Sequence, residues 1–184
     1  MRRLGPAHVH ANPVLLMLHG GPGMPDHFLT KRYPTGLEEL FIVVWWEQRG
    51  TGLSYHGVIP AKTMTVNQFV SDTVAVTNYL RARFGKEKIY VMGHSWGSFI
   101  GIQAAARAPE LFYAYIGMAQ MSYQLESERL AYEFMLEQFK QRGDRRMVHH
   151  LRKAPVDAVS GTPEQYLALR DQAMHVFGSV RPAT

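Results

Sequence analysis

The sequence contains no cysteine, which excludes disulfide bonds and every metal site built on thiolates. It also lacks long apolar runs. The longest strongly apolar stretches, residues 14–18 and 41–46, fall far short of the roughly 20 residues of a membrane-spanning helix. Residues 1–10 include two arginines but no apolar stretch after them, so we expect no secretory signal. These absences predict a cytoplasmic protein without a membrane partner.

Acidic residues are outnumbered, with 15 Asp plus Glu against 20 Lys plus Arg and a formal net charge of +5. The excess gathers in one stretch, opposed only by Asp144: Lys140, Arg142, Arg145, Arg146, Arg152 and Lys153. A nucleic-acid site would need a recognised binding motif or stacking aromatics in addition, and neither is found. We therefore expect the stretch to form the exposed face of a surface helix, with no nucleic acid as partner.

Apolar runs and helical patterns alternate along the first two-thirds of the 184 residues. Residues 14–18, 41–46, 88–92 and 113–119 read as buried strands. Between them, Thr65 and Gln68 have the spacing of a capping box, Gly85 stops the following helix, and a helix rich in small residues covers 98–108. This order predicts an α/β fold with a mostly parallel sheet flanked by helices. Residues 126–141 and a segment after Thr162 predict further helices without strands.

The most specific motif is Gly93-His94-Ser95-Trp96-Gly97, which fits the pattern G-x-S-x-G. It follows a predicted strand and precedes the small-residue helix, which is the context of a nucleophile elbow rather than of an ordinary turn. A serine on such a sharp turn has strained backbone angles, so Gly93 and Gly97 supply room. The turn raises the hydroxyl above the carboxyl edge of the sheet. We predict Ser95 as a nucleophile.

A glycine-rich segment, HGGPG at residues 19–23, directly follows the first predicted strand. Serine attack on an acyl carbon produces an oxyanion, which needs one N–H from the residue after the nucleophile, Trp96, and one from a loop after an earlier strand. Pro22 has no N–H, so the second donor is Gly20 or Gly21, and we favour Gly21. Alone the segment would be an ordinary Gly/Pro turn, but its pairing with the Ser95 motif favours an oxyanion hole.

A third motif, EQRGTGLS at residues 47–54, follows the second predicted strand. Its Gly50-Thr51-Gly52 segment superficially suggests a dinucleotide loop, but Tyr55 occupies the position of the third glycine. No P-loop pattern occurs anywhere in the sequence. A nucleotide cofactor is therefore not expected.

The HGGPG, EQRGTGLS and GHSWGS segments together resemble the α/β-hydrolase superfamily and, within it, the proline iminopeptidase-like branch. The resemblance covers residues 13–118. It implies a partial α/β-hydrolase core over residues 1–120 and an incomplete helical cap segment over 121–184. It also implies Ser95 as nucleophile, Trp96 and the 19–23 loop as oxyanion hole, and no cofactor or metal. Glu47 stands where the branch carries Asp, and we expect it to contact Arg49 or nearby backbone.

The resemblance further implies that the Asp and His of a catalytic triad follow the cap, beyond residue 184 of a chain that we take to be truncated. We expect the acids and histidines of the last third to be surface or cap-packing residues: Asp144, Asp157, Asp171, His149, His150 and His175. The helix glutamates are expected to form a solvated face: Glu126, Glu128, Glu133 and Glu137.

Two functions are compatible with these features. The first is a serine hydrolase that acts on a peptide, amide or ester bond of a small molecule or short peptide through an acyl-enzyme on Ser95, although this chain alone is expected to be inactive. The alternative is a non-catalytic α/β-hydrolase-like binding protein or an inactive fragment. A truncated sheet also predicts an exposed apolar edge.

Overall fold

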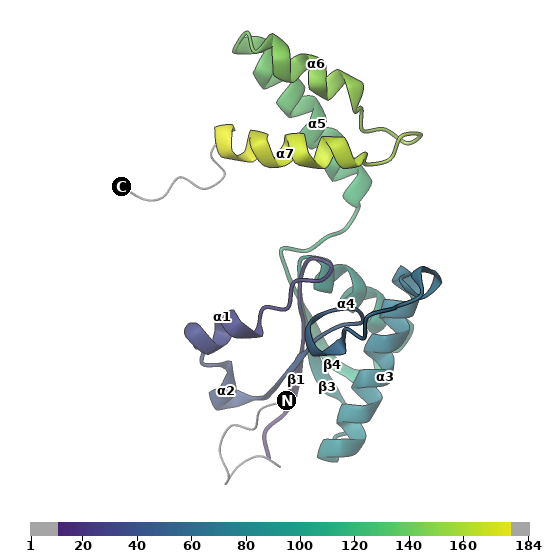
Figure 1. Ribbon diagram of the computed structural model, residues 1–184. Coiled ribbons are helices and arrows are strands. Elements are labelled where there is room, and N and C mark those ends of the chain that lie inside the picture. The colour runs from purple at the N-terminus through teal and green to yellow at the C-terminus, as the bar shows by residue number, and fades with distance from the viewer. Residues whose placement is uncertain (1–10, 178–184) are drawn as a thin grey trace. The chain divides into compact units, whose positions relative to one another are not determined.

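The structure, a computed structural model, describes residues 11–177, and the expectations for residues 1–10 lie outside that part. The chain divides into two units between Ser122 and Tyr123. We call residues 11–122 the core unit and residues 123–177 the helical unit, and each is described by itself (Figure 1). No helix among the described residues is long and apolar enough to cross a membrane.

The core unit is built on four parallel strands in the order β2-β1-β3-β4. Their bounds are β1 (Val14–Leu18), β2 (Ile42–Trp46), β3 (Ile89–His94) and β4 (Phe112–Met118). All four lie where the sequence predicts them, with ends shifted by two residues at most. All five residues of β1 are buried, because this strand has a neighbour on either side and is covered on both faces. The predicted α/β class is confirmed.

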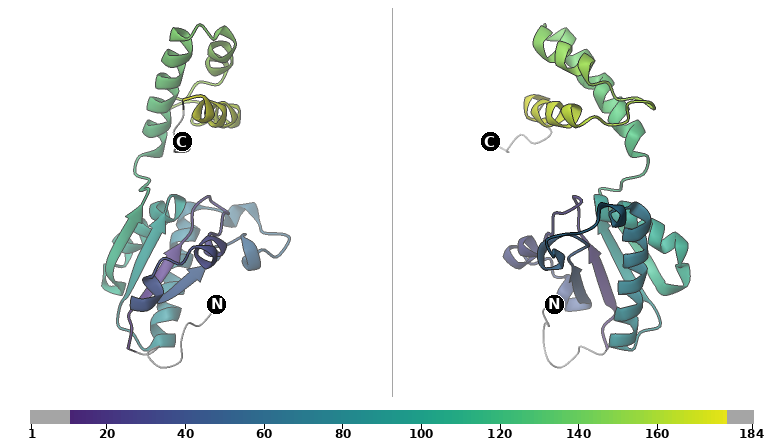
Figure 2. Two further views of the ribbon diagram at one scale, coloured as in Figure 1. Left: turned by 90° about the vertical axis from the view of Figure 1, so that its left-hand side faces the viewer. Right: turned by 45° about the vertical axis from the view of Figure 1, so that its right-hand side comes forward.

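Helices cover both faces of this sheet (Figures 1 and 2). The long helices α3 (Val66–Phe84) and α4 (Trp96–Arg107) lie on one face, and the short helices α1 (His27–Arg32) and α2 (Leu37–Leu40) lie on the other. Single 3₁₀ turns complete the unit at η1 (Gly52–Ser54), η2 (Ala61–Thr63) and η3 (Pro109–Leu111). The sequence did not predict α1 and α2, since six and four residues are too short for a helical period to stand out.

The ends of α3 follow their predicted signals only in part. The Thr65 side chain accepts a hydrogen bond from the Gln68 N–H, and Gly85 ends the helix with φ 62°. The Gln68 side chain does not complete a capping box, because its amide donates to Asp72 one turn further along. Helix α4 begins two residues before the predicted start and ends at Arg107, directly before the Ala108-Pro109 pair.

The order of the strands places a topological switch point between β1 and β3. From β1 the chain moves to β2 on one side, whereas from β3 it moves to β4 on the other side. In sheets of this kind, ligands bind outside the carboxyl ends of the two strands at such a point. Leu18 of β1 is paired with Gly93 of β3, so the segments after both strands leave the sheet at the same level. These segments carry the HGGPG and GHSWGS motifs.

The helical unit consists of α5 (Gln124–Gln141), α6 (Arg145–Lys153) and α7 (Glu164–Phe177). The three helices enclose an apolar cluster of their own: Met135, Phe139, Leu151, Ala154, Val156, Tyr166 and Ala173. Helix α6 presents Arg145, Arg146, Arg152 and Lys153 to solvent, as predicted for the basic stretch.

The prediction that all four α5 glutamates are solvated is wrong for Glu128. This side chain is buried and forms an ion pair with Arg170 of α7, and it accepts hydrogen bonds from Gln124 and from the Tyr166 hydroxyl. Sequence spacing placed Glu128 among the polar residues of α5, but α7 packs over this part of the helix and supplies polar partners for it.

Candidate active site

Ser95 occupies the turn between β3 and α4 with φ 52° and ψ −117°, a positive φ that serine rarely adopts. Its N–H donates to the Met118 carbonyl at 2.9 Å. Its carbonyl accepts from the N–H groups of Ser98 and Phe99, at 2.9 and 3.3 Å, and from the Ser98 hydroxyl at 2.6 Å. A strained residue persists only where its surroundings over-determine it, and these bonds on both sides of Ser95 do so.

The glycines on either side of Ser95 are required by close backbone contacts. A Cβ at Gly93 would lie 2.3 Å from the Gly97 carbonyl oxygen. A Cβ at Gly97 would lie 2.0 Å from the Leu18 carbonyl oxygen and 2.8 Å from that of His19. The first contact closes the turn itself, and the second lets the start of α4 lie against the end of β1. The predicted reason for both glycines is therefore confirmed.

Ser98, the last residue of the GHSWGS segment, anchors the turn to the chain that leaves β4. Its hydroxyl accepts a hydrogen bond from the Met121 N–H at 3.0 Å, and its carbonyl accepts one from the Tyr115 hydroxyl at 2.9 Å. Burial raises the pKa of the Tyr115 phenol, so this donor keeps its proton. The turn at Ser95 is thus fixed from α4 and from β4 together.

The HGGPG loop lies directly beside this turn. A Cβ at Gly20 would lie 3.4 Å from the Ser95 Cβ and 3.3 Å from the His94 ring, so the Gly20 backbone touches the turn at Ser95. Gly21 has φ 112°, and the Gly21-Pro22 peptide bond is cis. The structure therefore brings the loop and Ser95 together, as the sequence predicts.

Two buried residues that sequence reasoning assigned no role, His19 and Gln48, connect this loop to Trp96. Each has a relative exposure of at most 3%, and the polar side-chain atoms of both are hydrogen bonded. Their signal was present in the sequence, since each belongs to a recognised motif. The sequence did not indicate that they contact one another, because 29 residues separate His19 from Gln48 and 48 separate Gln48 from Trp96.

His94 and Asp26 form a further pair at the mouth of the loop. The His94 Nδ1 lies 4.0 Å from an Asp26 carboxylate oxygen, and both side chains are partly exposed. Neither His94 nor Asp26 hydrogen bonds to the Ser95 hydroxyl, and no other side chain within residues 11–177 does so. The part of the chain that the structure describes therefore assigns no general base to Ser95.

In the EQRGTGLS segment, Glu47 makes the second of the two alternative contacts expected for it. Its carboxylate accepts a hydrogen bond from the Leu53 N–H, which is nearby backbone, and Gly52 leaves room for it. Arg49 pairs instead with Asp72 of α3 through two hydrogen bonds of 2.7 Å. The Asp72 carboxylate raises the pKa of the Arg49 guanidinium, and the pair ties this loop to α3.

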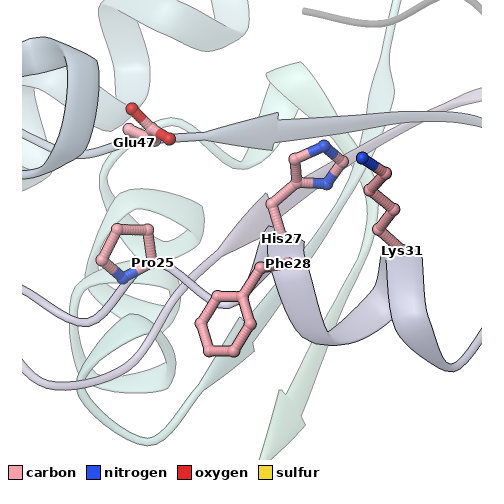
Figure 3. A pocket seen from close by; sticks show the side chains of 5 residues that line it. All are labelled: Pro25, His27, Phe28, Lys31 and Glu47. Atoms are coloured by element: carbon pink, nitrogen blue, oxygen red, sulfur yellow. The ribbon is translucent and has the colours of Figure 1, made fainter.

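A cavity of about 340 Å³ opens at the end of β2, between the Pro25–Phe28 segment and Glu47 (Figure 3). Lys31 of α1 also lines it, and the buried Nδ1 atom of His27 has no hydrogen-bond partner among the described residues. Ser95 follows β3, which β1 separates from β2, and Ser95 does not line this cavity. No cluster of three or more metal-ligating side chains occurs among residues 11–177.

The acids of the last third have structural partners inside the helical unit. Asp144 caps α6 by accepting from the Met147 N–H at 2.9 Å. Asp157 accepts from the N–H groups of Ser160 and Val159, which lowers the pKa of its carboxyl group. The histidines His149 and His150 are exposed on α6.

Comparison with known proteins agrees with this geometry. Residues 13–161 match the alpha/beta hydrolase fold family. The chain is 45% identical over 126 residues to the probable aminopeptidase YbaC of Bacillus subtilis (strain 168), covering 68% of this chain and 40% of that protein. It is 34% identical over 101 residues to a proline iminopeptidase of Xylella fastidiosa (strain Temecula1), covering 55% of this chain and 30% of that protein. The chain thus spans less than half the length of these relatives.

Solved structures give the same result. A proline iminopeptidase-related protein from Thermus thermophilus is similar with a TM-score of 0.52 and 29% identity, over 70% of this chain and 43% of that one. A proline iminopeptidase from Mycobacterium smegmatis is similar with a TM-score of 0.56 and 25% identity, over 91% of this chain and 52% of that one. The resemblance to the proline iminopeptidase-like branch is confirmed. With its parallel sheet, its strand-to-helix serine turn and a family match over most of its length, the chain belongs to the alpha/beta hydrolase fold family.

Proposed function

We propose that Ser95 is the nucleophile of a serine hydrolase that cleaves a peptide, amide or ester bond through an acyl-enzyme. The observation that carries this proposal is the backbone of Ser95, held at φ 52° by bonds from α4 and β4 at the switch point of the sheet. Strain of this kind collects at functional sites. An ordinary strand-to-helix turn would need neither the strain nor the close contacts at Gly93 and Gly97.

The proposed chemistry begins with attack of the Ser95 oxygen on the substrate carbonyl carbon, while the hydroxyl proton passes to a general base. The carbonyl oxygen becomes an oxyanion, for which the Trp96 N–H and the Gly21 N–H are the proposed donors. Expulsion of an amine or alcohol, which takes up the proton, leaves the acyl group on Ser95, and water then releases it as an acid. The histidine and acid of a triad, which the resemblance places after residue 184, are not assigned to any residue of this chain.

The relatives support an aminopeptidase-like substrate, a small molecule or a short peptide with a free amino end. Their names describe an aminopeptidase and proline iminopeptidases, and this chain aligns with less than half of each. We propose the helical unit as the cap segment that selects the substrate, since it follows β4 directly and has a core of its own.

A serine-reactive fluorophosphonate probe tests the nucleophile directly. We expect modification of Ser95, located by peptide mass spectrometry, and complete loss of it in Ser95→Ala. The matched control is Ser71→Ala, which removes an exposed serine of α3 and should label like the parent chain. Because oxyanion stabilisation and binding alone leave a rate about a thousandfold or more above water, slow labelling is expected even without a base.

The alternative, a non-catalytic binding protein of this fold, makes the opposite prediction. A chain that is folded by far-UV circular dichroism and still leaves Ser95 unmodified at saturating probe would overturn the proposed nucleophile. Labelling that persists in Ser95→Ala would assign the reactivity to another residue and would overturn it equally.

A further inference from the structure

Gln48 is a fully buried polar residue that bonds to two segments of the candidate site, the HGGPG loop and the turn at Ser95 and Trp96, which we call its two loops. It lies two residues beyond β2 and has a relative exposure of 0%. Its side-chain Nε2 donates to the His19 carbonyl at 2.9 Å, and its Oε1 accepts from the indole N–H of Trp96 at 3.1 Å. A buried carboxamide with both ends satisfied by residues of two different loops fixes the distance between those loops.

The two loops are the ones that carry the proposed oxyanion donors. Trp96 supplies one donor through its own backbone N–H, and its ring is held by Gln48 on one side and by Phe69, at a ring-centre distance of 5.5 Å, on another. His19 begins the loop that contains Gly20 and Gly21. The Gln48 side chain therefore joins both halves of the proposed oxyanion hole without itself needing to touch the substrate.

The backbone of Gln48 makes a second link to the same loop. Its N–H donates to the His19 Nε2 at 3.1 Å, so this ring nitrogen is the acceptor and the ring proton lies on Nδ1. The Nδ1–H then donates to the Gly20 carbonyl at 2.9 Å. The Gly20 carbonyl and the Gly21 N–H belong to the same trans peptide, in which C=O and N–H point in opposite directions. Because the carbonyl points toward the His19 ring, the Gly21 N–H points away from it.

The chemistry of the site explains why glutamine stands at this position. The contact to the His19 carbonyl needs a donor and the contact to the Trp96 indole needs an acceptor, and the glutamine carboxamide offers both in one neutral side chain. Glutamate would set an oxygen against the His19 carbonyl. Asparagine is shorter by one methylene, about 1.5 Å, and would not span both partners.

We infer that Gln48 is a positioning residue that holds the two oxyanion donors at their working distance. This inference rests on the proposed hydrolase function and goes beyond it, since it assigns a role to the EQRGTGLS motif. A merely structural role would require only that Gln48 fill its space and satisfy its bonds. A positioning role requires in addition that loss of those bonds slows the reaction at Ser95 more than it weakens probe binding.

The test uses the full chain with Gln48→Met, which keeps length and removes both polar atoms, and Trp96→Phe, which removes the indole N–H but keeps the backbone donor. We expect the maximal rate of fluorophosphonate modification of Ser95 to fall about tenfold to a hundredfold in Gln48→Met, with a nearly unchanged half-saturating concentration. The double variant should be no slower than Gln48→Met alone, because both changes break the same bond. Gln103→Met, which removes a half-buried carboxamide of α4 whose one hydrogen bond within residues 11–177 goes to the Phe99 carbonyl, is the control.

Amide hydrogen exchange of residues 19–24 gives a second readout that needs no reactivity. We expect faster exchange there in folded Gln48→Met and Trp96→Phe than in the parent chain or Gln103→Met. Unchanged exchange in both variants would overturn the positioning role, as would an unchanged rate of modification.

If the parent chain is not labelled at all, the proposed nucleophile fails, and hydrogen exchange alone then decides whether Gln48 holds the loops. If Gln48→Met does not fold, Trp96→Phe carries both measurements.

Discussion

At Ser95 the backbone is held at a positive φ by an arrangement that tolerates no side chain on either side. The Gly97 contact is the tighter one, since a Cβ there would lie 2.0 Å from the Leu18 carbonyl oxygen, which belongs to the central strand. Backbone atoms of a buried strand cannot move aside as the end of a flexible side chain can. Gly97 thus fixes the distance between α4 and β1, and with it the place of Ser95 beside the HGGPG loop.

Gly97→Ala should therefore destabilise the core unit by about 3 kcal/mol, the upper end of the usual cost of overpacking. Gly101→Ala is the matched variant on the same helix, because the atoms nearest to its Cβ would be side-chain atoms of Tyr115 and Leu18, at 3.0 and 3.1 Å, rather than backbone. Alanine also favours helix over glycine by about 1 kcal/mol, so we expect Gly101→Ala to change stability by no more than about that amount. Urea unfolding followed by tryptophan fluorescence measures both, and equal effects would contradict this account.

At the scale of elements, the strands were easier to predict than the helix contacts. Residues 14–18 and 42–46 are continuous apolar runs, and such runs form buried parallel strands with few alternatives. The faces of α5 are different, because helical spacing shows which residues share a side but not which other helix packs there. Glu128 illustrates this, since only the packing of α7 makes it a buried ion-pair partner.

The contact between α5 and α7 predicts how the helical unit responds to alkali. Burial, together with the 2.9 Å hydrogen bond to Glu128, raises the pKa of the Tyr166 phenol. The folded chain then keeps a proton that the unfolded chain loses near pH 10, so this stability is complete below about pH 10 and declines above it. One such group lowers the free energy of unfolding by about 1.4 kcal/mol per pH unit.

We expect Tyr166→Phe to flatten this decline relative to the parent chain in urea unfolding followed by far-UV circular dichroism at pH 8 and above about pH 10. Tyr132, whose pKa burial also raises, contributes equally to both proteins. Tyr123→Phe, at an exposed tyrosine, should keep the full decline. Parallel pH profiles for the parent chain and Tyr166→Phe would contradict the assignment to Tyr166.

At the scale of the whole molecule, the sheet has an open side. Within residues 11–177, no strand pairs with the outer edge of β4, and the seven residues of this strand include neither a charge nor a proline. Tyr113, Ile116 and Met118 are exposed on it. The exposed apolar edge expected from the sequence is therefore present in the described part of the chain. Natural proteins usually blunt such edges with lysine, proline or a bulge.

We therefore expect the isolated chain to associate as its concentration rises, and Ile116→Lys to reduce this association by placing a charge on the open strand. Ile102→Lys, at an isoleucine of α4 that is exposed to a similar degree, is the matched control and should associate like the parent chain. Sedimentation velocity over a range of concentrations measures the effect. A parent chain that remains monomeric throughout would contradict the expectation.

The sequence by itself determined the strands, the strand-to-helix turn at Ser95 and the glycine-rich loop, because each depends on neighbouring residues: a continuous apolar run, or small residues at fixed distances from a serine. Only the tertiary structure decided which polar residues connect them. Gln48 reaches Trp96 across 48 positions, Arg49 pairs with Asp72 rather than with Glu47, and Glu128 is buried by a helix 42 residues further along. Such pairings depend on which faces of the helices and loops pack together in three dimensions, and the spacing of residues along the sequence does not indicate this.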